Sequence, residues 1–546
     1  MKRKAVAAVL TAVMVASMFT GCGSDNGSSS AKSASAASAA SAANDTVDED
    51  GKVNGIMYQE GLPLVDEGDY TLSIFCDDSS ESGEFIMLDE FKKQTNVDVD
   101  LKIYPYETAT ERLNLDLNSG DYADVIGGWT LSDNAILTYG VNQGVFIPLE
   151  DYFEKYCPNI SAILDLPGVR EKMTAPDGHI YTIPYVCTDT TVGYSPYINT
   201  KWLENVGMSM PTTTDEFEAV LKAFKEQDAN GNGDASDEIP FSTDPNNKHI
   251  EAMAGYFGLP MNKLGIAIQN EKVVYGGVSD TYREFLSWFH KLYAEGLVDV
   301  ELYTQDSSTW EGKGNQDLYG VSIAYGSNEF TGIPAAEERG DFDSMPVLNT
   351  DKDGIWLRDT EGFSVYRTQA VITNKAEHPE IICRWFDNAF ALENGIGCNR
   401  GPVGVIVNKE DDGYHAIDTT TLSEEDQEKY SWGNLWPQSL PKYLPVDFEF
   451  VEEHPMYDEK KATEEAYEAN LTKEIIPSYW IDLDKIDTFS DTNTAIKDFF
   501  EQQQAQFVCG ELDIDNDADW QAYVDGMYSL GLEDWVATQG IEEIAK

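Results

Sequence analysis

The chain has 546 residues, 42% of them hydrophobic, which is enough to bury the cores of two or more compact units. Lys and Arg number 37 against 97 Asp and Glu, so the formal net charge is −60. A surface this acidic repels phosphate backbones, which excludes binding to DNA or RNA. It also disfavours a polyanionic ligand, unless the binding site is locally basic.

The N-terminus has the organisation of an export signal. Residues 2–4 are basic, and residues 5–19 are uncharged but too few to span a bilayer. The Phe-Thr-Gly-Cys sequence that ends at Cys22 resembles the lipobox of bacterial lipoproteins, with Phe19 in place of the usual Leu. We therefore expect a signal peptide over residues 1–21 and acylation of Cys22, which would anchor the protein to the extracellular face of the cell membrane. A plain secretory signal with a chance cysteine is the alternative.

A low-complexity segment follows the predicted anchor. Residues 24–43 are almost wholly Ser, Ala and Gly, a composition that cannot bury a core. We expect residues 22–67 to form a flexible linker that holds the folded part of the chain away from the membrane.

From residue 71 onward, strand and helix patterns alternate. Segments rich in β-branched and aromatic residues predict strands over residues 71–76, 97–104 and 123–127, with amphipathic helices between them. This alternation predicts an α/β fold with a parallel sheet. Because helices begin at the carboxyl ends of such strands, we expect ligand-binding groups in the loops there.

The later part of the chain continues the same mixture. Apolar stripes at helical spacing predict helices over residues 212–226, 282–295, 379–392 and 495–507. Further strands are predicted over residues 179–186, 321–324 and 365–373.

Residues 228–238 form the most specific local motif, Asp-Ala-Asn-Gly-Asn-Gly-Asp-Ala-Ser-Asp-Glu. Asp228, Asn230 and Asn232 fall at positions one, three and five of an EF-hand-type loop. Gly233 falls at position six, where the backbone turns sharply. Alternating oxygen donors separated by small residues can surround one hard cation, so we expect this loop to bind calcium. A solvated acidic turn is the alternative.

The end of this loop departs from the standard EF-hand. Asp234 could offer its main-chain carbonyl at position seven, but Ile239 stands where position twelve requires Glu. The closing carboxylates would therefore come from Asp237 and Glu238.

Three segments around the calcium-like loop match one known family. Lys-Trp-Leu-Glu-Asn-Val-Gly at 201–207 precedes Pro-Thr-Thr-Thr-Asp-Glu-Phe at 211–217, and Asp-Glu-Ile-Pro at 237–240 ends the loop. This arrangement resembles the extracellular solute-binding proteins of family 1, the sugar-binding class of importer lipoproteins. Residues 120–124 and 507–513 fit the same pattern.

The resemblance implies a periplasmic-binding-protein-like α/β fold, in which two lobes are joined by a hinge and close over a ligand between them. We assign residues 68–186 and 362–408 to lobe 1, and residues 187–361 and 409–546 to lobe 2. The resemblance also implies an extracellular substrate-binding lipoprotein of an ABC importer. Such a protein binds an oligosaccharide without chemistry, delivers it to a membrane permease and holds a structural calcium ion. We expect it to act as a monomer.

The residues that would hold a sugar are predicted from their chemistry, because the family has no ligand motif to carry over. Aromatic faces stack on sugar rings, and polar side chains bond the hydroxyls. The chain has 11 Trp and 28 Tyr, more than a core needs. The candidates lie in irregular or glycine-rich segments or near strand ends, and they are Trp129, Tyr194, Trp310, Tyr325, Trp432 and Trp436, with Asp77, Asp78, Asn328 and Arg400. For each aromatic residue, ordinary core packing is the alternative.

Signatures of catalysis are missing from the sequence. It contains no GxSxG, HExxH or P-loop motif, and its six His residues have no metal-binding spacing. We therefore predict a binding protein rather than an enzyme. Abundant carboxylates leave a surface-anchored glycoside hydrolase as one alternative, which would need two carboxylates about 5 to 9 Å apart in one cleft. A peptide-binding lipoprotein is the other.

Overall fold

The computed structural model describes residues 45–78, 84–244, 250–332, 340–417, 419–445, 448, 450–451, 455–541 and 543–545. The predicted signal peptide and Cys22 lie outside these residues. Within them, no helix is both long and apolar enough to cross a membrane.

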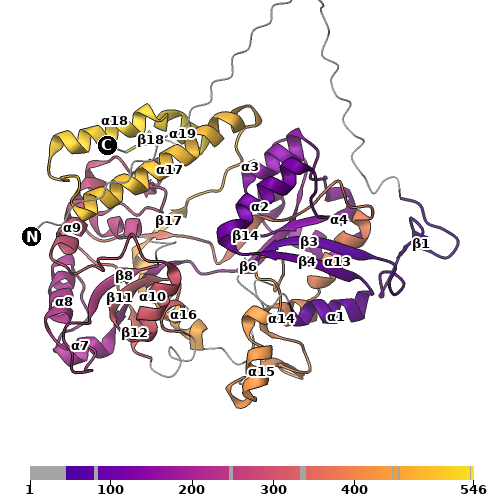
Figure 1. Ribbon diagram of the computed structural model, residues 1–546, viewed down its shortest axis with the longest axis horizontal. Coiled ribbons are helices and arrows are strands. Elements are labelled where there is room, and N and C mark those ends of the chain that lie inside the picture. Colours follow the sequence, from indigo (N-terminus) through magenta and orange to yellow (C-terminus); the bar gives the residue numbers. More distant parts are fainter. Residues whose placement is uncertain are drawn as a thin grey trace, which may run out of the picture. The chain divides into compact units, whose positions relative to one another are not determined.

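A five-stranded sheet forms the centre of the first lobe (Figure 1). Its order is β4-β3-β5-β14-β6, with bounds β3 Thr71–Asp77, β4 Asp98–Tyr104, β5 Val125–Gly127, β6 Thr182–Thr188 and β14 Phe363–Ile372. β3 pairs in parallel with β4 and β5, as the alternating pattern predicts. β14 is antiparallel to both of its neighbours, so the prediction of a parallel sheet is wrong there. The chain re-enters this sheet only after building another one, and no βαβ crossover sets the direction of β14.

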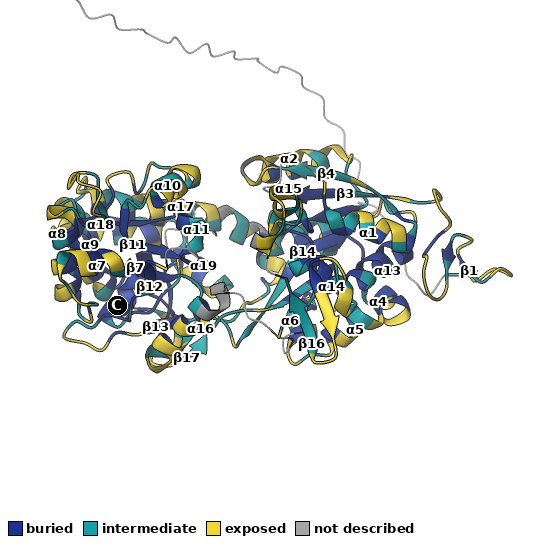
Figure 2. Ribbon diagram, turned by 90° about the horizontal axis from the view of Figure 1, so that it is seen from below, coloured by how far each residue is buried: buried dark blue, intermediate teal, exposed yellow. Residues whose placement is uncertain are grey.

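Alternate residues of β3 enter two different cores. Leu72, Ile74 and Cys76 pack on one face of the sheet, while Phe75 packs on the other, as the period of two in a strand requires. Strands β3, β7 and β11 are dark blue in Figure 2, because most of their residues are buried. Because both faces of this sheet are covered, a ligand can contact it only at the strand ends and in the loops.

Helices cover the first sheet. Their bounds are α1 Ile86–Thr95, α2 Tyr106–Ser119, α3 Asp133–Ala135, a π-helix Ile136–Asn142, α4 Glu150–Tyr156, α5 Pro158–Leu164, α6 Val169–Met173, α13 Pro379–Ala389 and α14 Leu392–Arg400. Trp385 of α13 packs edge-on against Phe91 of α1 and stacks on Trp436. Trp436 and Leu440 lie in this core, although the sequence assigned residues 409–546 to the second lobe.

A four-stranded sheet forms the centre of the second lobe. Its order is β12-β7-β11-β8, with bounds β7 Ser195–Asn199, β8 Ile239–Thr243, β11 Tyr319–Ala324 and β12 Phe342–Ser344. β8 is parallel to β11, whereas β7 is antiparallel to β11 and β12. The helices of this lobe are α7 Thr200–Val206, α8 Thr214–Glu226, a 3₁₀-helix Ile250–Phe257, α9 Asp280–Ala294, α10 Ser307–Asn315 and α11 Asn328–Thr331.

The start of α8 shows how local sequence sets these elements. The Thr213 hydroxyl accepts from Glu216 N–H at 3.2 Å, and the Glu216 carboxylate accepts from Thr212 N–H at 2.9 Å. The cap therefore satisfies one main-chain donor of the first turn and one just before the helix, which favours a helix start at this point. Phe217 and Phe224 are buried on the apolar face of the helix, which therefore packs on the second core.

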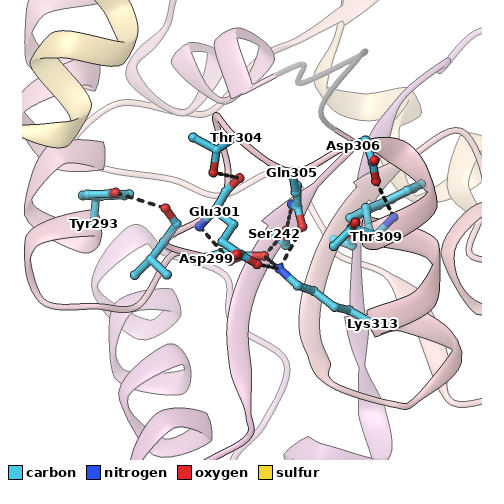
Figure 3. A network of polar contacts seen from close by, with 12 residues as sticks. Ser242, Tyr293, Asp299, Glu301, Thr304, Gln305, Asp306, Thr309 and Lys313 are labelled. Atoms are coloured by element: carbon cyan, nitrogen blue, oxygen red, sulfur yellow. Dashed lines mark hydrogen bonds and ion pairs between the residues drawn. The ribbon is translucent and has the colours of Figure 1, made fainter. Parts of the chain in front are cut away.

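Lys313 of α10 fixes the loop between α9 and α10 (Figure 3). Its ammonium donates to Asp299 at 2.9 Å, to Gln305 at 2.9 Å and pairs with Glu301 at 2.8 Å. Asp299 also accepts from the Ser242 hydroxyl at 3.2 Å, so the loop is fastened to β8. With three acceptors and little exposure, Lys313 holds the carboxyl end of β8 in place rather than facing a ligand.

Smaller sheets and the C-terminal helices complete the structure. The strands are β1 Lys52–Val53 with β2 Met57–Tyr58, β9 Ile266–Gln269 with β10 Lys272–Tyr275 and β18 Glu543–Ile544, β13 Trp356–Arg358 with β17 Leu471–Ile475, and β15 Val407–Glu410 with β16 Gly413–Ala416. The helices are α15 Glu424–Lys429, α16 Pro455–Tyr467, α17 Ile486–Cys509, α18 Asp517–Ser529 and α19 Leu532–Thr538, with short 3₁₀ turns at Thr419–Thr421, Trp432–Asn434, Glu468–Asn470 and Leu483–Lys485.

Part of the predicted linker is folded. Val53, Met57, Leu64 and Val65 are buried in the core of the first lobe. The prediction of a flexible linker is therefore wrong for residues 45–67, because burial of these four apolar side chains fastens the segment to the first core.

Candidate functional site

A first aromatic cluster lies at one end of the first sheet, near the carboxyl end of β5 and the amino end of β14. Tyr185 of β6 and Tyr366 of β14 are direct cross-strand partners, and their rings stack at 5.4 Å. Trp129, which follows β5, lies edge-on to Tyr366 at 5.3 Å. Trp129 is 46% exposed, so it presents an aromatic face to solvent.

Asp77 supports the loop that carries Trp129. Its two carboxylate oxygens accept from Trp129 N–H at 3.0 Å and from Thr130 N–H at 2.6 Å. Burial raises the pKa of Asp77, and these hydrogen bonds oppose the rise. Gly128, with φ of +137°, brings the main chain so close that a Cβ would collide with Asp77. Asp77 is fully buried, so it holds Trp129 in place and does not face a ligand.

Gln438 connects Asp78 to Trp432, because its N–H donates to the Asp78 carboxylate and its side-chain amide donates to Trp432 O. Asp78 is buried and accepts from Gln438 N–H at 2.7 Å. The Lys442 ammonium donates to the Gln438 side chain at 2.5 Å and lies 5.1 Å from the centre of the Trp432 ring. Burial lowers the pKa of Lys442 to about 8. Trp432 is 55% exposed, so it is a second candidate surface for stacking.

A second aromatic cluster follows β11 in the second lobe. The rings of Tyr194 and Tyr325 lie 6.1 Å apart, edge to face. The Lys460 ammonium of α16 lies 3.7 Å from the centre of the Tyr325 ring, and the Glu329 carboxylate accepts from Tyr325 N–H at 3.0 Å. Asn328 begins α11 next to this cluster and is half-buried.

Asp189 joins the two aromatic clusters, and the sequence analysis missed it. Its carboxylate accepts from the hydroxyls of Tyr325 at 3.2 Å and of Tyr366 at 3.4 Å. The Ser364 hydroxyl donates to the same carboxylate at 2.5 Å. An acidic residue three positions after a predicted strand was the only available signal, and it is common in this acidic chain.

Two chain segments between the sheets run side by side at this point. We call residues 189–193 the first crossing segment and residues 359–362 the second. Asp189 N–H donates to Gly362 O at 3.1 Å, and Asp359 N–H donates to Thr191 O at 3.0 Å. The paired segments place Asp189 between strands of the two sheets, since β6 and β14 belong to one sheet and β7 to the other.

Helix α16 packs against the first crossing segment. The Lys460 ammonium donates to Gly193 O at 2.9 Å, and the Glu464 carboxylate accepts from Thr191 N–H at 2.6 Å. Burial lowers the pKa of Lys460 to about 8. Lys460 therefore links the segment between the sheets to Tyr325.

Three predicted ligand residues lie elsewhere. Trp310 is buried, packs on Phe330 at 5.6 Å and donates to the Ser322 hydroxyl at 3.2 Å. Trp436 is fully buried against Trp385. Both rings are covered by core side chains, so we remove them from the candidate set. Arg400 ends α14 and lies 5.7 Å from the Phe450 ring, in neither aromatic cluster.

The calcium-like loop is folded around its own polar side chains. Gly233 N–H donates to Asp228 at 2.9 Å. The side-chain amides of Asn230 and Asn232 donate to Asp237 at 3.3 and 2.7 Å. The predicted ligands thus point toward one another, although Asp234 uses its carboxylate within its own turn, accepting from Ser236 N–H at 3.1 Å.

Two carboxylate oxygens in this loop have no hydrogen-bond partner. Asp228 Oδ1 and Glu238 Oε2 are both buried. The other oxygen of Glu238 accepts from Ala229 N–H at 2.9 Å, and burial raises the pKa of Glu238. Buried oxygens without partners are costly, and a divalent cation with oxygen ligands would satisfy both. The residues present therefore fit calcium.

Sequence comparisons find one matching family and several similar proteins. A family model described as bacterial extracellular solute-binding protein matches residues 78–395. The fructooligosaccharide ABC transporter substrate-binding protein FusA of Streptococcus pneumoniae is 33% identical over 335 residues, which cover 59% of this chain and 61% of FusA. Lipoprotein LipO of Bacillus subtilis is 28% identical over 280 residues, 50% of this chain and 52% of LipO. The matched segments thus span less than two thirds of either relative.

Structural comparison extends the likeness beyond these segments. The structure of S. pneumoniae FusA in complex with kestose has a TM-score of 0.76 and 26% identity, and the match covers 86% of this chain and 98% of that one. An EF-hand mutant of FusA in complex with fructo-nystose has a TM-score of 0.74 and 27% identity, again over 86% and 98%. The two-lobed mixed α/β fold predicted from the sequence is thereby confirmed.

Proposed function

Because the chain belongs to the bacterial extracellular solute-binding proteins, we propose that it binds an oligosaccharide outside the cell and delivers it to the permease of an ABC importer. The observation that carries this proposal is the pair of aromatic clusters joined by Asp189. Exposed aromatic faces next to hydrogen-bonding groups are what a sugar ring with its rim of hydroxyls requires. The printed name of FusA, a fructooligosaccharide-binding relative, supports the same ligand class.

The charges near the clusters favour a neutral sugar. Among the described residues, Asp189, Asp359 and Glu329 lie at or beside the tyrosines, whereas the Lys460 ammonium lies over the Tyr325 ring. A carboxylated sugar would meet more negative than positive charge there, so an uncharged oligosaccharide is the better fit.

A thermal-shift screen tests the ligand class. The chain without residues 1–22 would be melted with kestose, with an oligogalacturonide and with a mixed tripeptide library. We expect kestose or a longer neutral sugar to raise the melting temperature, because a ligand that binds only the folded state stabilises it. A shift with peptides alone would replace this proposal with a peptide-binding lipoprotein.

The same samples test for hydrolysis. Chromatography of the neutral sugar after overnight incubation should return it intact, because a transport protein binds without chemistry. Cleaved sugar would instead support the surface-anchored glycoside hydrolase.

We also propose that the loop of residues 228–238 holds a structural calcium ion. The side chains of Asp228, Asn230, Asn232, Asp237 and Glu238 would surround it, with the carbonyl of Asp234. The two unpartnered buried oxygens support this, as does the existence of an EF-hand in FusA, which the name of its mutant implies. The ion would brace the second lobe and take no part in sugar binding.

The proposed location follows from the N-terminal sequence. Acylation of Cys22 would tether the monomeric protein to the outer face of the membrane, in agreement with the name of lipoprotein LipO. Labelling with a radioactive fatty acid should mark the wild-type protein and leave a Cys22→Ala variant unmarked and released into the medium. Equal retention of both forms would rule out the lipid anchor.

A further inference from the structure

Asp189 has an unusual set of partners for a loop carboxylate. It accepts from Thr190 N–H at 2.8 Å, from the Ser364 hydroxyl at 2.5 Å and from the hydroxyls of Tyr325 and Tyr366. Three of these donors are side chains from two different sheets or the loops that follow them. One half-buried carboxylate thus accepts hydrogen bonds from hydroxyls of both lobes.

Each tyrosine belongs to one aromatic cluster. Tyr366 stacks on Tyr185 and touches Trp129, whereas Tyr325 meets Tyr194. The Lys460 ammonium on the Tyr325 ring fixes that ring from a second direction. The orientation of both phenol groups is therefore set by neighbours that do not include a ligand.

The chemistry of the phenol group gives this arrangement a consequence. A tyrosine hydroxyl has one proton to donate, and an ionised carboxylate can only accept. When both protons point to Asp189, the oxygens of Tyr325 and Tyr366 keep lone pairs for other donors. The Thr190 hydroxyl lies 3.4 Å from the Tyr325 oxygen but donates its proton to Val192 O at 2.6 Å, so both phenol oxygens keep acceptor capacity.

We propose that Asp189 is a positioning residue for sugar recognition: it holds the hydroxyls of Tyr325 and Tyr366 as acceptors, so that sugar hydroxyls donate to them. This inference rests on the proposed oligosaccharide binding. Asp189 also connects the two aromatic clusters to the first crossing segment. A sugar that contacts both tyrosines would therefore bind hydroxyl groups that a single carboxylate positions. The acceptors that it positions suit a neutral sugar with free hydroxyls.

The test compares Asp189→Asn with a matched control, Asp387→Asn. Asp387 is also a hydrogen-bonded aspartate of low exposure, accepting from Ile160 N–H at 2.8 Å and from the Asn159 amide at 3.0 Å, but it contacts neither aromatic cluster. Calorimetric titration would use the panel sugar that binds the wild-type chain most tightly, starting with kestose. We expect Asp189→Asn to weaken binding about ten- to hundredfold and Asp387→Asn to change it less than about twofold.

A double-mutant cycle separates positioning from a general structural effect. Tyr366→Phe should weaken binding in the wild-type background and have little further effect in Asp189→Asn, because the carboxylate acts through that hydroxyl. If Asp189→Asn does not fold, the cycle of Tyr325→Phe with Tyr366→Phe decides instead. Their losses should be non-additive, because both hydroxyls depend on one carboxylate.

Three results would overturn the inference. They are wild-type affinity in Asp189→Asn, an equal loss of affinity in Asp387→Asn, and strictly additive losses in the cycle. In each of them the wild-type chain still binds sugar, so the proposed function stands. If the wild-type chain binds no sugar at all, the proposed function and this inference both fail.

Discussion

Trp129 has two properties that a residue stacking on a sugar needs. Its ring is about half exposed. Its main-chain N–H donates to Asp77, which holds the backbone, and an edge contact with Tyr366 orients the ring. A ring that is already oriented loses little conformational freedom on binding, so more of the contact energy reaches the affinity.

Truncation of this ring should affect binding and not folding. We expect Trp129→Ala to weaken binding of the neutral sugar by about 1–3 kcal/mol, roughly ten- to hundredfold, because the stacking surface is lost. The melting temperature should change little. Trp310→Ala is the matched control, because it removes a buried ring and should cost about 3–5 kcal/mol of stability. Titration calorimetry and thermal melting of both variants check this, and unchanged affinity in Trp129→Ala would exclude it from the site.

The sequence could identify these tryptophans as candidates for sugar binding, but it could not tell the exposed ones from the buried ones. Trp129 and Trp310 both lie in irregular or polar stretches, and only long-range contacts separate them, since Phe330 and Ser322 cover Trp310. The sequence analysis missed Asp189 for the same reason. Its importance comes from Tyr325 and Tyr366, which are more than a hundred positions away, and no local pattern encodes that meeting.

Helices and strands with a clear hydrophobic periodicity were predicted with nearly correct bounds. A helix whose first turns are polar was predicted too short. β3, expected over residues 71–76, spans Thr71–Asp77, and α8, expected over residues 212–226, spans Thr214–Glu226. α17, expected over residues 495–507, begins nine residues earlier, at Ile486. Its first turns are rich in Asp, Thr, Ser and Asn, which weaken the helical pattern. Packing of Ile486 and Phe489 holds them in the helix.

The calcium-like loop should make the stability of the protein depend on bound calcium. A chelator should lower the melting temperature by a few degrees, because bound calcium stabilises the folded state by mass action and removal leaves two buried oxygens unpaired. Asp228→Ala should melt at one temperature with or without chelator. Asp517→Asn, in an exposed acidic run at the start of α18, is the control and should keep the full response. A chelator response in Asp228→Ala as large as that of the wild type would place the ion elsewhere.

Across the whole molecule, stability should depend on pH through a buried carboxyl. Asp387 is 6% exposed, and burial raises its pKa from 3.8 to about 6. Between about pH 4 and 6 the folded chain therefore holds a proton that the unfolded chain has released. The free energy of unfolding should fall as pH rises through this window, by an amount on the order of 2–3 kcal/mol. Urea unfolding at pH 4 and pH 7 measures this. Asp387→Asn should reduce the difference and leave the share of Asp359, whose pKa burial also raises to about 6. An unchanged slope in that variant would assign the pH dependence to other groups.

Arg367 fastens a distant part of the chain to the first sheet. From β14 its guanidinium donates to Asp133 at 2.8 and 2.5 Å and to Tyr479 O at 2.7 Å, and it lies 4.2 Å from the centre of the Trp480 ring. The segment it holds leads from β17 to α17, so the buried guanidinium connects parts of the chain that local interactions could not bring together.

Loss of this guanidinium should therefore destabilise the molecule far more than loss of a surface arginine. We expect Arg367→Met to cost about 3–5 kcal/mol, because it leaves the Asp133 carboxylate and two carbonyls without their donor. Arg112→Met is the matched control. Arg112 pairs with Asp116 one helical turn away and is 48% exposed, so its loss should leave the free energy of unfolding almost unchanged. Urea unfolding of both variants decides: similar small losses would mean that the apolar contacts of Trp480 and Ile481, not the guanidinium, hold this segment to the first lobe.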